Sequence, residues 1–124
     1  MSNKRVLSIG QCAADEWNVS RTIQQHLGAE VESTAGAAEA LARLRERAFD
    51  LVLVNRVLDA DGSSGLDLIG QIKADEALRH LPVMLVSNYE DAQRRAEERG
   101  ALPGFGKAAL RQPRTIERLK AVLG

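Results

Sequence analysis

Short apolar runs alternate with segments of helical periodicity along the chain, and this alternation constrains the fold more than any single motif. The apolar runs lie near residues 5–9, 30–33, 51–54, 83–86 and 101–105. Apolar side chains recur at helical spacing within 14–27, 37–49, 66–72, 89–100 and 113–123. A strand followed by a helix, repeated in this way, predicts an α/β domain in which helices cover both faces of a parallel sheet.

Individual residues sharpen the expected boundaries. The run from Leu51 to Val54 is typical of a strand buried on both faces, so it is expected at the middle of the sheet. Gly28 is expected to end the first helix, and Pro113 to stand in the first turn of the last one. Ser87 and Asn88 resemble a cap for the fourth helix.

Length and composition exclude several classes of protein. With 124 residues the chain is expected to form one domain, residues 1–124. The 44% hydrophobic and 27% charged residues argue against disorder, and the net charge of zero gives no electrostatic signal for nucleic acid or an anionic membrane. Neither a spanning segment nor a signal peptide is recognisable, so a cytoplasmic location is expected. The single cysteine, Cys12, cannot form an internal disulfide.

Polar residues follow the predicted strands at the edge where the function of such sheets usually lies. In open parallel sheets, ligands bind at the carboxyl ends of the strands. The residues delivered there are Gly10, Gln11 and Cys12, Asn55 and Arg56, Ser87 and Asn88, and Gly106 and Lys107. No glycine-rich phosphate loop, metal-spaced His/Cys group or nucleophile elbow accompanies them, so an enzyme is not expected.

The order and spacing of several segments resemble the receiver domain of two-component response regulators. The segments are 5–9 (RVLSI), 35–44 (AGAAEALARL), 49–54 (FDLVLV), 65–69 (GLDLI), 81–87 (LPVMLVS), and Gly100-Ala101 with Lys107 seven residues after the glycine. The resemblance covers nearly the whole chain. It implies the flavodoxin-like fold of the chemotaxis regulators, a five-stranded sheet in the order 2-1-3-4-5.

The resemblance also assigns a role to each strand end. In this family an aspartate after strand three accepts a phosphoryl group, two acids after strand one help it to hold magnesium, and a Ser/Thr and a Lys contact the phosphoryl oxygens. Here the acceptor position is Asn55 and the acidic pair falls on Gly10 and Gln11, whereas Ser87 and Lys107 match. The switch aromatic of the family would fall near Gly104.

These departures remove the groups that phosphoryl transfer and magnesium binding require in this family. The amide of Asn55 neither attacks phosphorus as a carboxylate does nor supplies an anionic ligand. Without the three carboxylates, nothing offsets the dehydration of magnesium. We therefore expect no metal, no cofactor and no phosphorylation at residue 55. Lys107 would be the only charge at the site, so it is expected to bond Asn55, to reach Asp59 or Asp61, or to point into water.

The resulting prediction is a pseudo-receiver that acts in two-component signalling through protein–protein interaction without phosphorylation. Its partner would be a histidine kinase, another regulator or a second copy of the chain, and the resemblance suggests the fourth helix, fifth strand and fifth helix as the face involved. Trp17, which lies off the apolar stripe of the first helix, fits either an interface or the edge of the core. Two alternatives are an active acceptor that uses Asp59 or Asp61, and an anion or small-ligand sensor in the same pocket.

Overall fold

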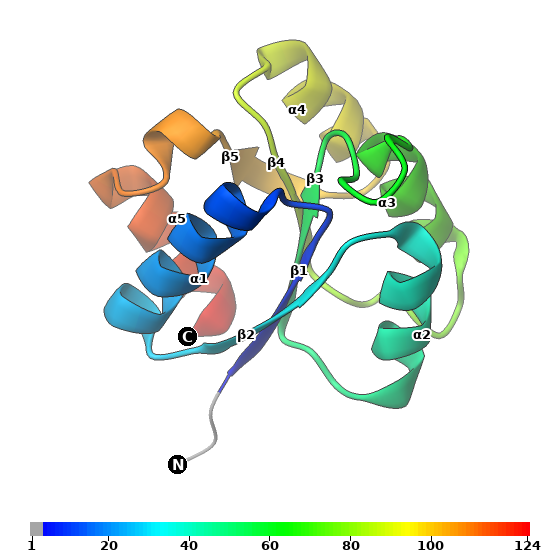
Figure 1. Ribbon diagram of the computed structural model, residues 1–124, viewed down its shortest axis with the longest axis horizontal. Helices are drawn as coiled ribbons and strands as arrows, with labels where there is room; N and C mark the ends of the chain where they lie inside the picture. Colours follow the sequence, from blue (N-terminus) through cyan, green and yellow to red (C-terminus); the bar gives the residue numbers. More distant parts are fainter. Residues whose placement is uncertain (1–3) are drawn as a thin grey trace.

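A five-stranded parallel sheet forms the centre of the computed structural model, which describes residues 4–124. The strand order is β2-β1-β3-β4-β5, as predicted, and all neighbouring pairs are parallel. The strands are β1 (Arg5–Ile9), β2 (Glu30–Thr34), β3 (Leu51–Asn55), β4 (Val83–Val86) and β5 (Leu102–Phe105). The helices are α1 (Ala13–Leu27), α2 (Ala37–Glu46), α3 (Gly65–Ala74), α4 (Glu90–Glu98) and α5 (Pro113–Leu123), with a 3₁₀ turn at Lys107–Ala109 (Figure 1).

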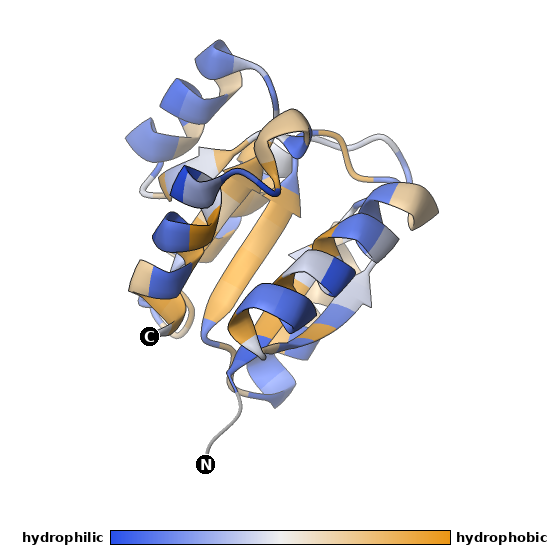
Figure 2. Ribbon diagram, turned by 90° about the vertical axis from the view of Figure 1, so that its left-hand side faces the viewer, coloured by the Kyte–Doolittle hydropathy of each residue, from blue (hydrophilic) through white to orange (hydrophobic). Residues whose placement is uncertain are grey.

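Two apolar cores lie on opposite faces of the sheet. Because side chains alternate along a strand, Leu7 and Ile9 of β1 point to one face and Val6 points to the other. The first core packs against α2, α3 and α4, and the second packs against α1 and α5. Figure 2 shows the apolar central strands between helices whose outer surfaces are hydrophilic. Helices therefore cover both faces, as the sequence predicts.

Two helix boundaries differ from the sequence prediction. α2 ends at Glu46 rather than near Phe49, because Arg47 is extended and the chain turns back to bury Phe49 in the first core. α4 begins at Glu90, and its N-cap residue Tyr89 makes no side-chain capping bond. Ser87 and Asn88 lie before this helix and hydrogen-bond elsewhere, so their prediction as helix caps was wrong.

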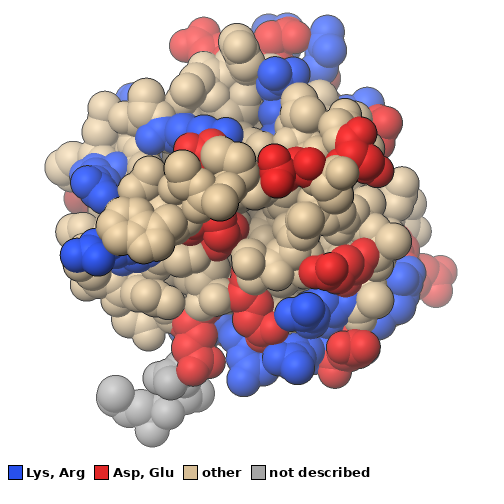
Figure 3. Space-filling view, in the orientation of Figure 1, with Lys and Arg blue, Asp and Glu red and all other residues tan. Residues whose placement is uncertain are grey.

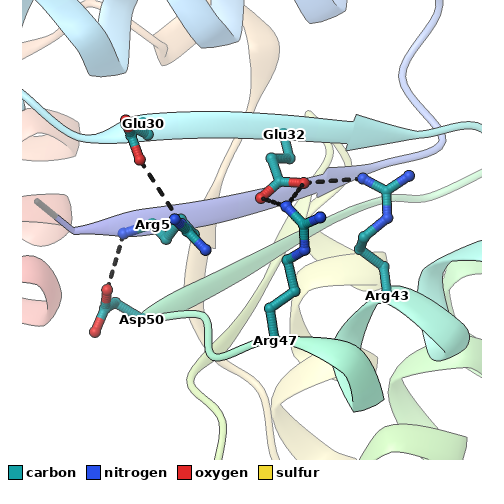
Figure 4. Close-up of polar contacts among 6 residues, drawn as sticks. All are labelled: Arg5, Glu30, Glu32, Arg43, Arg47 and Asp50. Carbon is teal, nitrogen blue, oxygen red and sulfur yellow. Dashed lines mark hydrogen bonds and ion pairs between the residues drawn. The ribbon is translucent and has the colours of Figure 1, made fainter.

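Charged side chains fasten the edge strand β2 to its neighbours. The guanidinium groups of Arg43 and Arg47 lie 2.9 and 3.1 Å from Oε1 of Glu32, which joins α2 to β2. Arg5 of β1 pairs with Glu30 at 3.7 Å, and its backbone N–H donates to Asp50 Oδ2 at 2.8 Å (Figure 4). Over residues 4–124, no helix is both long and apolar enough to span a membrane.

Candidate functional site

The parallel strands bring the predicted residues to one edge of the sheet. Residue Asn55 ends β3 and pairs in register with Val86, so Ser87 follows directly on the neighbouring strand. Gly10 follows β1, whose last residue, Ile9, pairs with Val54. The structure thus places Gly10, Asn55 and Ser87 together at the carboxyl edge.

Asn55 joins the loops that follow β1 and β3. Its side-chain Nδ2 donates to the carbonyl oxygens of Val57, at 2.8 Å, and of Gly10, at 3.1 Å. Only the NH₂ of the amide can face two carbonyl oxygens, because its own oxygen is an acceptor. An ionised carboxylate has no donor for either carbonyl and would be repelled by both. The local structure at residue 55 is therefore built for an amide.

Gly10 leaves no room for an acidic side chain in this backbone. Its φ is +78°, a left-handed conformation that residues with a Cβ adopt at a cost. A Cβ added here would lie 2.5 Å from Cδ2 and 2.9 Å from Cα of Leu58, which is fully buried. The glycine is thus required by the close approach of the loop after β3.

Gln11, the second position of the predicted acidic pair, is 7% exposed. Neither its Oε1 nor its Nε2 has a hydrogen-bond partner in the described part of the chain. An unpaired neutral amide is costly to bury, and an unpaired carboxylate is much more so. The burial of residue 11 therefore also favours a neutral group.

The loops after β4 and β5 are held together by polar side chains. The Oγ of Ser87 accepts a hydrogen bond from the backbone N–H of Tyr89 at 3.1 Å. Asn88 Oδ1 accepts from the backbone N–H of Ala108 at 3.1 Å, and a Cβ at Gly106 would lie 2.2 Å from that oxygen. These contacts fix the conformation of the turn after β4.

Lys107 does not make any of the contacts predicted for it. Its Nζ lies 2.6 Å from Oδ2 of Asp15, in the first turn of α1. The hydrogen bond from Lys107 holds the pKa of the Asp15 carboxyl below its usual range. The expectation that Lys107 would be the only charge at the site was wrong. α1 and α5 cover the same face of the sheet, and this brings the loop before α5 within reach of α1.

The two aspartates in the loop after β3 are not in the environment of Asp15. Asp59 and Asp61 are both exposed, and Asp61 Oδ1 accepts from the backbone N–H of Ser63 at 3.0 Å. Hydrogen bonding by the Ser63 side chain, and then by its backbone N–H, lowers the pKa of Asp61. The backbone N–H of Asp59 donates to Gly10 O at 3.0 Å. Across residues 4–124, no cluster of three or more His, Cys, Asp or Glu side chains could hold a metal ion.

The sequence also matches the model of a known protein family. The model of the family described as response regulator receiver domain matches residues 15–105. The chain belongs to that family. Over 107 residues it is 34% identical to the polar-differentiation response regulator DivK of Brucella ovis, and the alignment covers 84% of each chain.

Two solved structures show the same receiver fold. A protein of Chloroflexus aurantiacus superimposes with a TM-score of 0.80 at 18% identity, covering 98% of both chains. The chemotaxis protein CheY4 of Vibrio cholerae has a TM-score of 0.78 at 21% identity, covering 98% of this chain and 100% of that one. The chain is thus a receiver domain of two-component signalling, a class of signalling module that interacts with kinases and other regulators.

Sequence reasoning missed three residues that shape this receiver domain: Asp15, Leu58 and Gln93. Asp15 had a usable signal, because the predicted topology places the helices that follow the first and fifth strands on one face. Leu58 had none, since its approach to Gly10 depends on the exact path of the loop after β3. Trp17 is 58% exposed, so the edge-of-core reading for it was wrong.

Proposed function

We propose that this receiver domain is a pseudo-receiver, which acts through protein–protein interaction and without phosphorylation of residue 55. The observation that carries the proposal is the pair of hydrogen bonds that Asn55 Nδ2 donates to Gly10 O and Val57 O. Both bonds require an amide, so the acceptor position has become a structural joint between two loops. It no longer holds a nucleophile.

The surroundings of Asn55 support the same proposal. Magnesium binds through carboxylates, phosphate oxygens and water, and it loses its hydration water reluctantly. Gly10 cannot be replaced by an acid without displacing Leu58, and Gln11 is buried as a neutral amide. The match to the family model begins at residue 15 and ends at 105, so it includes neither residues 10 and 11 nor Lys107.

The pairing of Lys107 with Asp15 weighs against the anion-sensor alternative. Phosphate and sulfate bind most strongly where a free ammonium or guanidinium group faces them. The ammonium of Lys107 is already neutralised by a carboxylate at 2.6 Å. The proposed state of the domain therefore needs neither metal nor anion to be complete.

A domain that signals by binding another protein needs an exposed surface for that partner, and two regions fit this role. One is the face formed by α4, β5 and α5, which the family resemblance suggests. The other is the outer side of α1, where Trp17 stands exposed with the guanidinium of Arg21 5.0 Å from the centre of its ring. An exposed tryptophan is a frequent anchor of protein interfaces. The partner would be a histidine kinase, another regulator or a second copy of this chain.

Intact-mass measurement tests the loss of phosphoryl chemistry. The full chain is incubated with acetyl phosphate and Mg²⁺, with a phosphorylatable receiver domain as the positive control. The expected result is no increase in mass. A phosphoryl adduct on the wild type that disappears in an Asp59→Ala/Asp61→Ala variant would replace the proposal with an acceptor in the longer loop.

The single tryptophan gives a direct test of the interaction surface. Sedimentation velocity over a range of protein concentrations shows whether two copies associate. If they do so through α1, the fluorescence emission of Trp17 shifts to the blue as the dimer forms, and Trp17→Ala abolishes the dimer. A dimer that survives Trp17→Ala with unchanged affinity would place the interface elsewhere.

A further inference from the structure

The hydrogen-bonded ladder between β4 and β5 is interrupted at its centre. Met84 pairs with Leu102, but Val86 pairs with Phe105, so the register shifts between the two pairs. Two residues of β5, Pro103 and Gly104, therefore lie opposite Leu85 alone. Pro103 has no N–H to donate to the ladder. The backbone of β4 and β5 needs other partners at this point.

The side chain of Gln93, on α4, supplies those partners. Its Nε2 lies 2.9 Å from Leu85 O, 3.0 Å from Ser87 O and 3.3 Å from Phe105 O. Its Oε1 accepts from the backbone N–H of Gly104 at 3.2 Å. One amide thus bonds to both strands across the register shift, in place of backbone bonds.

Gly104 makes room for this amide. A Cβ at residue 104 would lie 2.1 Å from Leu85 O and 2.8 Å from Gln93 Oε1. On the other side of the strand, a guanidinium nitrogen of Arg118, from α5, donates to the carbonyl oxygen of Gly104. The same short segment of β5 is therefore tied to both flanking helices.

Apolar packing gives α4 little else to fix its position. Its buried residues are Ala92 and Ala96, which have the smallest side chains that can be buried. Its other residues besides Gln93 are charged and exposed, and charges of both signs intermix at the top of the molecule, where α4 lies (Figure 3). A helix that buries two methyl groups can shift at low cost unless directional bonds hold it.

We infer that Gln93 is a positioning residue that locks α4 onto β4 and β5, so that the α4–β5–α5 face keeps one shape whatever happens at residue 55. This rests on the proposed function only in treating that face as a binding surface. The lock consists of the contacts of Gln93 Nε2, whose two hydrogens are shared among three carbonyl oxygens, and of the hydrogen bond that Gln93 Oε1 accepts from Gly104.

Hydrogen exchange measured by NMR tests the lock. Gln93→Met keeps the length of the side chain and removes both the donors and the acceptor. We expect the amides of Gly104 and Ser87 to exchange at least tenfold faster, while the amides of β1 and β3 keep their rates. Gln25→Met, at an exposed position on α1, is the matched control and should change neither set.

A second variant separates hydrogen bonding from side-chain size. Gln93→Glu keeps an acceptor for Gly104 but has no donor for the three carbonyl oxygens, so it should also open the β4–β5 segment. Unchanged exchange at Gly104 and Ser87 in Gln93→Met would overturn the inference. So would a uniform acceleration of every amide, because that would mean a general loss of stability. Protection retained in Gln93→Glu would exclude the bridging role of Nε2.

A double variant tests the independence of the face from residue 55. Asn55→Ala should change the amide chemical shifts of the loops after β1 and β3 but not those of α4 and β5. In the Gln93→Met background the same substitution should spread its effects to α4. Equal spread in both backgrounds would refute the lock. A phosphoryl adduct in the intact-mass measurement would contradict the proposed function, but it would not affect the expected hydrogen-exchange results.

Discussion

Lys107 Nζ and Asp15 Oδ2 lie 2.6 Å apart, although 92 residues separate them in the sequence. The pair joins the loop after β5 to the first turn of α1. Both side chains are about one-third exposed, at 34% and 29%, so water and salt weaken their attraction. The contact sets where the lysine points more than it sets the stability of the fold.

The first prediction concerns the pH dependence of that pair. Lys107 lowers the pKa of Asp15, so the ionised carboxyl stabilises the fold above the ordinary value of 3.8, and this stabilisation is lost as the pH falls through the lowered pKa. Asp15→Asn should cost about 1 kcal/mol or less at neutral pH, and the difference should vanish in acid. Urea denaturation across this pH range measures it. A deficit that is constant with pH would contradict the assignment, and Asp59→Asn is the control.

The second prediction is that releasing Lys107 creates an anion site. In the wild type, titration with phosphate should leave the amide resonances of Ser87 and Lys107 unshifted, because the ammonium is already paired. Asp15→Ala should produce saturable shifts at both residues, and Asp15→Ala/Lys107→Ala should abolish them. Saturable shifts in the wild type would instead favour the anion-sensor alternative.

Two asparagines at the same edge give the third prediction, because one acts as a donor and the other as an acceptor. Asn55→Asp loses both donated bonds and places a carboxylate against two carbonyl oxygens, so it should destabilise the fold by roughly 1–3 kcal/mol at neutral pH. Asn88→Asp retains an acceptor for the N–H of Ala108, so it should be nearly neutral. Thermal melts of the two variants compare them. Equal losses would mean that the donor role of Asn55 is unimportant.

Two glycines with positive φ provide the fourth prediction. Gly28→Ala meets nothing within 4 Å, so its cost is that of the left-handed backbone, about 1 kcal/mol. Gly10→Ala has the same backbone cost and also collides with Leu58, which should add a further 1–3 kcal/mol or so. Chemical denaturation of both variants gives the difference. A Gly10→Ala variant as stable as Gly28→Ala would show that an acidic side chain could be accommodated there.

The fifth prediction concerns Glu16 of α1. Burial raises the pKa of this carboxyl, although Ser20 Oγ donates to its Oε2 at 2.6 Å. A raised pKa means that ionised Glu16 opposes folding above that pKa and that the penalty disappears as the pH falls below its ordinary value of 4.5. Glu16→Gln should therefore raise the melting temperature at pH 7, by the equivalent of about 1 kcal/mol or less, and not at low pH. A gain that persists in acid would refute the electrostatic cause.

The elements and both cores follow from apolar periodicity, because it reports burial directly, whereas the strand order follows from the resemblance to receiver domains. For the candidate site, the sequence predicted which residues lie at the carboxyl edge of the sheet but not which contacts they make there. Asn55, Ser87 and Gly10 stand where strand ends must meet, whereas the partner of Lys107 depends on how two helices pack on the far side of the sheet. The role of Gln93 was also hidden, since a glutamine on a charged helix gives no sign that its amide will enter a neighbouring sheet.

The two borders of the sheet limit how copies of this domain could join. The edge strand β2 carries the charged side chains of Glu30 and Glu32, and β5 at the opposite border contains Pro103, which has no backbone N–H. Growth of the sheet from molecule to molecule is disfavoured on both sides. Two copies of this domain are therefore expected to associate, if they do, through helical surfaces and not by joining their sheets.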